Sequence, residues 1–271
     1  MIPLTGLISL YFWLIARFRN YRATRVWKNV YRVDGPYCNG SRWSTSTVKN
    51  IYLIDRGHKV TIIDPGVQVP FLGIKKALAS MNKSIRQVDV VLCTHYHVDH
   101  VATARDIVAA SGARVYADII DIPYITGKSK HSFPETKGLH WLLFTALTKV
   151  PRSRLLRWMF LLPRGWYLEH VIPLTNGRDV PGLKGFKVLT TPGHTYGSIS
   201  FYNEDQKAIF VGDALQPKEF QPKGCPFTMD HQLEAISADR IARLPVEVVL
   251  PADIKPMLDN AQEKLQEFRL Q

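Results

Sequence analysis

The residues of this chain best suited to chemistry lie between His95 and His100, where three imidazoles and one carboxylate fall within six residues. The stretch before them, Val88 to Cys93, is mostly apolar and predicts a buried strand. In an extended backbone, His95 and His97 point the same way because side chains alternate between faces. Neutral imidazole and carboxylate ligands suit zinc, and also iron or manganese. Four donors this close together exceed one face of a single tetrahedral site, so the run predicts two adjacent metal ions.

Two alternatives involve no metal. The run is also compatible with a solvated histidine cluster or a nucleic-acid patch, but the apolar strand before it argues against both. Asp99 has an alternative role of its own, because a helix is expected to begin there and aspartate is a preferred N-terminal cap.

Three further positions follow other apolar stretches: Asp64 in the segment 62–66, His194 in 191–195 and Asp213 in 210–214. Each is weak evidence alone, since an aspartate before Pro-Gly is an ordinary turn residue. Together with His-x-His-x-Asp-His, the set resembles the pattern of the metallo-β-lactamase-fold hydrolases over roughly residues 45 to 260. The resemblance includes the glyoxalase II-like and lactonase-like members.

The resemblance implies a role for each residue. His95, His97 and His194 would hold the first metal, Asp99 and His100 the second, and Asp213 would bridge the two. Asp64 would orient the ligands from behind them, a role whose loss lowers metal affinity. The implied cofactor is Zn²⁺, two ions per chain, with iron or manganese as the alternative at the second site.

One position departs from the family pattern. Where the family usually has a histidine after Leu-Pro-Gly, this chain has Asp253 after Leu-Pro-Ala. Asp253 could ligate directly, which would favour iron or manganese, or act through a water; otherwise the second site is weak and one metal suffices. We expect a two-metal site with Asp253 as a distant or direct ligand.

The implied reaction is hydrolysis. A bound zinc lowers the pKa of water to about 7, and the resulting hydroxide would attack an ester, lactone, thioester or amide. Asp99 would orient this hydroxide and carry a proton to the leaving group, and Tyr196 would polarise the substrate carbonyl or only pack. Two alternatives stay open: a membrane-associated phosphodiesterase acting on phospholipid-like substrates, and a non-enzymatic metal or ligand sensor with an incomplete second site.

The net charge of +12 is concentrated in two basic clusters, within residues 17–32 and 149–164, and both adjoin apolar residues. This pairing suits an anionic membrane surface and a small-molecule or lipid-like substrate better than a nucleic-acid groove. The three cysteines have no regular spacing and predict reduced thiols rather than disulfides, as in a cytoplasmic protein.

The N-terminal residues 2–16 are almost wholly apolar. As a helix of about fifteen residues they would measure roughly 22 Å, short of a ~30 Å hydrocarbon core. The alternatives are an anchor on the cytoplasmic face of the membrane, a helix packed on the protein's own surface, and a cleaved signal. We therefore expect an N-terminal segment over residues 1–36 and the catalytic domain over 37–271. A helical insert at about 124–174 would cap the core, or form a lid or membrane-facing rim.

The elements that must position these residues follow from hydrophobic periodicity. Strands are expected at 47–54, 59–63, 88–93, 114–117, 186–191, 198–203, 208–211 and 246–250, and helices at 71–81, 99–110, 230–244 and 256–271. Two β-rich halves, each flanked by helices, predict an α/β protein of the αβ/βα four-layer sandwich type, with an apolar N-terminal helix. The proposed ligands all lie at strand ends or in the loops just beyond them, where α/β proteins place their sites.

Overall fold

The computed structural model describes residues 20–35, 50–66, 70–129, 167–215, 225 and 227–268. The expected N-terminal helix, most of the expected insert and the basic cluster at 149–164 lie outside the described residues.

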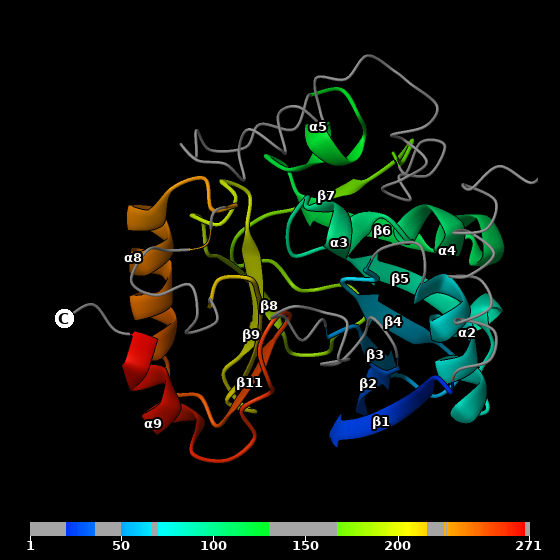
Figure 1. Cartoon of the computed structure of the whole chain (residues 1–271), viewed down its shortest axis with the longest axis horizontal. Helices are drawn as coiled ribbons and strands as arrows, with labels where there is room; N and C mark the ends of the chain where they lie inside the picture. The colour runs from blue at the N-terminus through cyan, green and yellow to red at the C-terminus, as the bar shows by residue number, and fades with distance from the viewer. Residues whose placement is uncertain are drawn as a thin grey trace, which may run out of the picture.

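Two sheets form the centre of the molecule (Figure 1). The first contains seven strands in sequence order: β1 Arg22–Trp27, β2 Val30–Asp34, β3 Tyr52–Asp55, β4 Val60–Ile63, β5 Val88–Leu92, β6 Arg114–Asp118 and β7 Ile172–Leu174. The second contains four strands in the order β11 Val248–Pro251, β10 Ala208–Gly212, β9 Ile199–Asn203 and β8 Lys187–Thr190. Strands β4 to β7 pair in parallel, so the loops after β4, β5 and β6 leave the sheet at the same edge.

Helices cover the outer face of each sheet. Helices α2 (Pro70–Ser80) and α4 (Ala104–Ser111) lie against the first sheet, and α8 (His231–Ala242) and α9 (Ala261–Leu265) against the second (Figure 1). Shorter helices are η1 (Ile85–Gln87), α3 (Val98–Val101), α5 (Ile122–Ile125) and η3 (Gln266–Phe268). The predicted αβ/βα four-layer sandwich is therefore confirmed.

The alternation of side chains along each strand builds three separate apolar layers. Leu53 and Ile62 pack against the helices of the first half, whereas the neighbouring Tyr52 and Ile63 face the second sheet. On strand β10, Phe210 joins the layer between the sheets, and Ile209 belongs to the layer beneath α8 and α9. Because both sheets are buried on both faces, their central strands are almost wholly apolar, as the sequence shows.

Several elements differ from expectation. Residues 22–34, assigned from the sequence to an N-terminal segment ahead of the fold, form the antiparallel strands β1 and β2 of the first sheet. The helix expected at 99–110 is two helices, α3 and α4, and the final helix is shorter than 256–271. Within the described part of the chain, no helix has the length and apolar character required to cross a membrane.

Candidate metal centre

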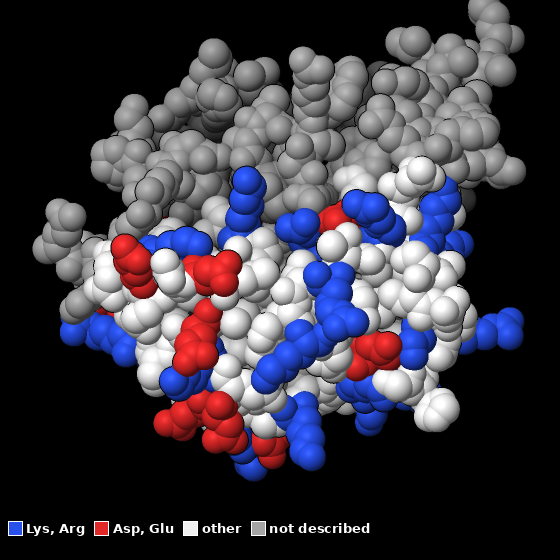
Figure 2. All heavy atoms as spheres, turned by 90° about the horizontal axis from the view of Figure 1, so that it is seen from below, with Lys and Arg blue, Asp and Glu red and all other residues white. Residues whose placement is uncertain are grey.

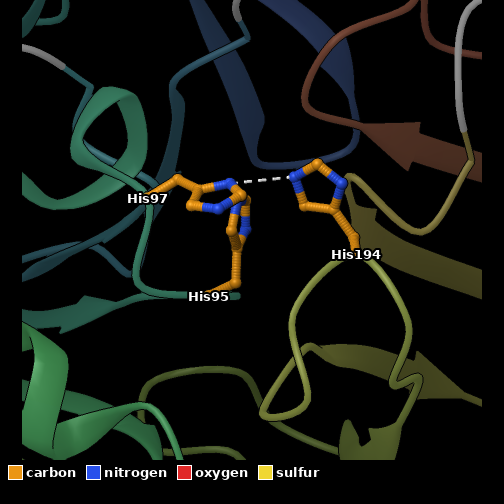
Figure 3. A group of neighbouring side chains, drawn as sticks. All are labelled: His95, His97 and His194. Atoms are coloured by element: carbon orange, nitrogen blue, oxygen red, sulfur yellow. Dashed lines mark hydrogen bonds between the residues drawn. The ribbon is translucent and has the colours of Figure 1, made fainter. Parts of the chain in front are cut away.

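The predicted ligands meet where the two sheets approach each other. His95 and His97 follow β5 and His100 lies in α3, whereas His194 lies between β8 and β9 and Asp213 follows β10. All five side chains are buried. In Figure 3, His95 and His97 approach from one side and His194 from the other, with its ring directed towards them. The centre is therefore assembled from both halves of the fold.

Two groups of side chains could each hold a metal ion. In the first, His97 Nδ1 lies 3.1 Å from His95 Nε2 and 3.0 Å from His194 Nε2 (Figure 3). In the second, which combines His95, His100 and Asp213, His100 Nε2 lies 3.3 Å from Asp213 Oδ2. The ligand atoms of each group all lie within 4.8 Å of one another. The same Asp213 oxygen lies 3.4 Å from His194 Nε2, so it stands between the two groups, as a bridging ligand would.

The electrostatics of the first group favour metal binding. Burial, together with the neighbouring imidazoles, lowers the pKa of His95 and of His97 well below the ordinary range. Both rings are therefore neutral at pH 7, which is the form that binds a metal. For His100, burial also disfavours the charged ring, but the carboxylates of Asp213, Asp64 and Asp99 outweigh it and leave its pKa well above the ordinary value. Four buried imidazoles around buried carboxylates are a donor set that fits a divalent transition metal.

Asp64 lies behind His100. Its Oδ2 is 3.1 Å from His100 Nδ1, and the two oxygens accept hydrogen bonds from Thr94 N at 2.8 Å and Thr94 Oγ1 at 2.7 Å. The backbone of Asp64 has φ +48°, a left-handed conformation that is uncommon outside glycine, and its N–H donates to Leu92 O of β5 at 2.9 Å. This geometry suits the orienting role predicted for Asp64.

A second orienting group was not foreseen from the sequence. His194 Nδ1 lies 3.2 Å from Thr228 Oγ1, which in turn donates to the buried Glu234 Oε1 at 2.8 Å. Glu234 Oε1 is itself 3.5 Å from His194 Nδ1. Gly193 makes this approach feasible, since a Cβ there would lie 2.1 Å from the Glu234 backbone nitrogen. Thr228 and Glu234 therefore hold His194 with Nε2 turned towards the other ligands, the arrangement usual for metal-binding histidines.

The model of the metallo-β-lactamase superfamily matches residues 45–253. The chain belongs to the metallo-β-lactamase superfamily. It is 25% identical over 230 residues to the probable metallo-hydrolase YflN of Bacillus subtilis, covering 79% of this chain and 83% of that protein. It is also 24% identical over 166 residues to a hydroxyacylglutathione hydrolase of Methylobacillus flagellatus, but that match covers only 61% of this chain and 46% of the relative.

Solved structures of the superfamily have the same fold. A metallo-β-lactamase family protein from Thermus thermophilus aligns with a TM-score of 0.63 at 19% identity, over 89% of this chain and 78% of that one. The protein TTHA1623 in a di-iron-bound form aligns with a TM-score of 0.54 at 25% identity, over 77% and 89%. The chain is thus a metallo-β-lactamase-superfamily hydrolase, and membership implies a metal for which the two groups are the candidate ligands.

The remaining predicted residues lie at the edge of this metallo-β-lactamase centre or beyond it. Asp99, with 37% of its side chain exposed, has Oδ2 at 3.9 Å from His100 Nε2. Asp253 is buried just after β11. It follows Ala252, whose backbone N–H donates a hydrogen bond to Gly212 O. Among the described residues, neither aspartate belongs to the two ligand groups, so their ligand roles stay predictions. Tyr196 is 48% exposed next to the His194 loop, and its substrate role also stays a prediction.

Proposed function

We propose that the chain uses two Zn²⁺ ions to hydrolyse an ester, lactone or thioester that carries an apolar group. The observation behind this proposal is the pair of buried ligand groups, which share His95 and in which Asp213 of the second group also lies 3.4 Å from His194 of the first. His97 and His194 would complete the first site, and His100 would hold the second ion. When bound, zinc supplies a Lewis acid and lowers the pKa of water.

The residues around the ions have distinct tasks. Asp99 is the one carboxylate of the predicted set with substantial exposure, so it can exchange a proton with water and with a leaving group. Asp64 and Glu234 hold the rings of His100 and His194 from behind. The buried, neutral His95 and His97 keep their nitrogen lone pairs available for the metal.

Exposed apolar side chains near the centre support a lipophilic substrate. Tyr196 follows Thr195 in the loop of His194 and is 48% exposed, and Phe227, 45% exposed, precedes the Thr228 that contacts His194. Acyl chemistry is further supported by the relative named as a hydroxyacylglutathione hydrolase. In this proposal, the acyl group of the substrate packs on these two aromatic side chains.

A phosphodiesterase acting on phospholipid-like substrates at an anionic membrane surface is the second candidate. It is favoured by the net charge of +12 and by the Lys and Arg side chains that are scattered over the described face in Figure 2, where Asp and Glu gather mainly on the left. Such charge raises the local concentration of anionic substrates. The two candidates share the metal centre and differ only in the substrate.

One experiment tests both candidates. Metal content is measured on protein purified without added metal, and the same sample is assayed with a lactone, a thioester and a bis-aryl phosphodiester. We expect two equivalents of zinc and turnover of the lactone or thioester. This turnover should be abolished in His97→Ala and retained in His58→Ala, a control for the loss of an exposed histidine. Turnover of the phosphodiester alone would favour the second candidate. Less than one equivalent of metal would refute both.

A further inference from the structure

A buried carboxylate next to the metal centre has no task in the mechanism above. Asp121 is only 1% exposed and lies just before α5, at the edge of the first sheet. Its Oδ2 accepts two hydrogen bonds, one from the Tyr96 backbone N–H at 2.9 Å and one from Thr195 Oγ1 at 2.9 Å. These donors are 25 and 74 residues away along the chain, so the contact depends on the tertiary fold.

The ordinary role of an aspartate at this position is to cap its own helix. Asp121 is the N-cap residue of α5, yet its side chain makes no capping hydrogen bond. The carboxylate is turned instead towards the two loops. This burial is unfavourable for the ionised form: despite the hydrogen bonds from Thr195 and Tyr96, burial raises the pKa of Asp121 to about 7. A turn before a short helix does not by itself require a buried carboxylate.

The two loops that Asp121 joins carry the whole first ligand group. Tyr96 lies between His95 and His97, and Thr195 directly follows His194. Thr195 is further restrained, because its N–H donates to Ser198 Oγ at 2.9 Å and its hydroxyl lies 2.9 Å from the same oxygen. The stacked rings of Tyr96 and Tyr124 of α5, with centroids 4.4 Å apart, add a second contact between α5 and the first loop.

The chain also leaves room for the carboxylate. Gly197 faces Asp121, and a Cβ at position 197 would lie 2.3 Å from Asp121 Oδ1. Any larger residue would have to displace Asp121 or the loop of His194. The glycine and the carboxylate therefore form one contact between the two halves of the fold.

We propose that Asp121 is a positioning residue that sets the distance between the His95–His97 loop and the His194 loop, and thereby the metal affinity of the first ligand group. This inference rests on the proposed metal site. Asp121 belongs to neither candidate ligand group, and it contacts the two ligand loops through the backbone N–H of Tyr96 and the hydroxyl of Thr195.

The test measures the zinc affinity of the full chain by competition with a chromophoric chelator. The parent protein is compared with the variants Asp121→Ala, Asp121→Asn and His97→Ala. Asp118→Asn is the matched control, because this nearby buried aspartate accepts a hydrogen bond from Ile120 N, at 2.8 Å, within its own turn. We expect about a tenfold loss of affinity in Asp121→Ala, in the range known for residues that orient ligands. Asp121→Asn, which keeps an acceptor oxygen, should lose less, and Asp118→Asn should stay within about twofold of the parent.

A second readout separates positioning from simple loss of structure. The absorption spectrum of the cobalt-loaded protein should change in the Asp121 variants, while the spectrum of Asp118→Asn should not. If Asp121→Ala fails to fold, Gly197→Ala tests the same contact, since it displaces the carboxylate without removing it. If zinc affinity and the cobalt spectrum are unchanged in Asp121→Asn and Gly197→Ala, the inference about Asp121 is overturned, but the proposed metal site is not. Unchanged affinity in His97→Ala would overturn the proposed metal site and this inference with it.

Discussion

Replacing Asp121 by asparagine should make the protein more stable at neutral pH. The buried carboxyl has a pKa of about 7, against an ordinary value of 3.8. Below pH 3.8 it is protonated in both the folded and unfolded states, and between the two values only the unfolded state loses the proton. Stability therefore falls as pH rises through this window, by ~1.4 kcal/mol per pH unit. Above pH 7 the ionised carboxylate costs the fold about 4 kcal/mol, a penalty that the neutral amide introduced by Asp121→Asn avoids.

The measurement is chemical denaturation of both proteins between pH 4 and pH 8, after a chelator has removed the metal so that only the chain's own charges act. The difference in free energy of unfolding should grow with pH and level off above about pH 7. Asp118→Asn should show a smaller change, because burial raises the pKa of Asp118 less. A difference that does not vary with pH would refute the reasoning. Greater stability together with weaker zinc binding would mark Asp121 as a group kept for function.

Two further predictions concern the metal centre and its support. The carboxylates around His100 outweigh the effect of burial on its pKa, so the ring is charged when no metal is bound. Zinc loading at pH 7 should therefore release a proton, which a dye indicator detects. Zinc loading without proton release would contradict the charged state of His100. Gly212→Ala should lower the free energy of unfolding by about 2–3 kcal/mol, because φ is +52° and the new Cβ would lie 2.4 Å from Thr94 Oγ1. The control Gly177→Ala has φ +78° but no atom within 4 Å, so denaturation should show only the backbone cost of about 1 kcal/mol; equal losses would refute the contact.

The residues with local signals were predictable. The run from His95 to His100 combines ligand types at close spacing with an apolar strand, and the structure gathers three of its four predicted ligands at one candidate centre. The strands of both sheets that are buried on two faces were recognised for the same reason, since their apolar runs are nearly continuous.

The contacts that no local pattern encodes were missed. Thr228 reaches His194 across 34 residues, and Glu234 is an unremarkable residue in the first turn of a helix until the fold brings it there. Strands β1 and β2 carry Arg22, Arg25 and Arg32 beside apolar residues. These arginines made the segment look like a basic cluster, so the alternation of side chains typical of an edge hairpin was not recognised. In each case the deciding interaction is tertiary and has no counterpart in sequence spacing.

The assembly of the candidate ligands from both sheets has a consequence for the resistance of the protein to unfolding and proteolysis. An ion bound between His97 and His194 would act as a cross-link between the halves of the chain, and unfolding would have to release it. Each tenfold rise in free metal above the dissociation constant then adds ~1.4 kcal/mol of resistance to unfolding. Metal supply would accordingly set how long the chain survives proteolysis as well as how fast it turns over substrate.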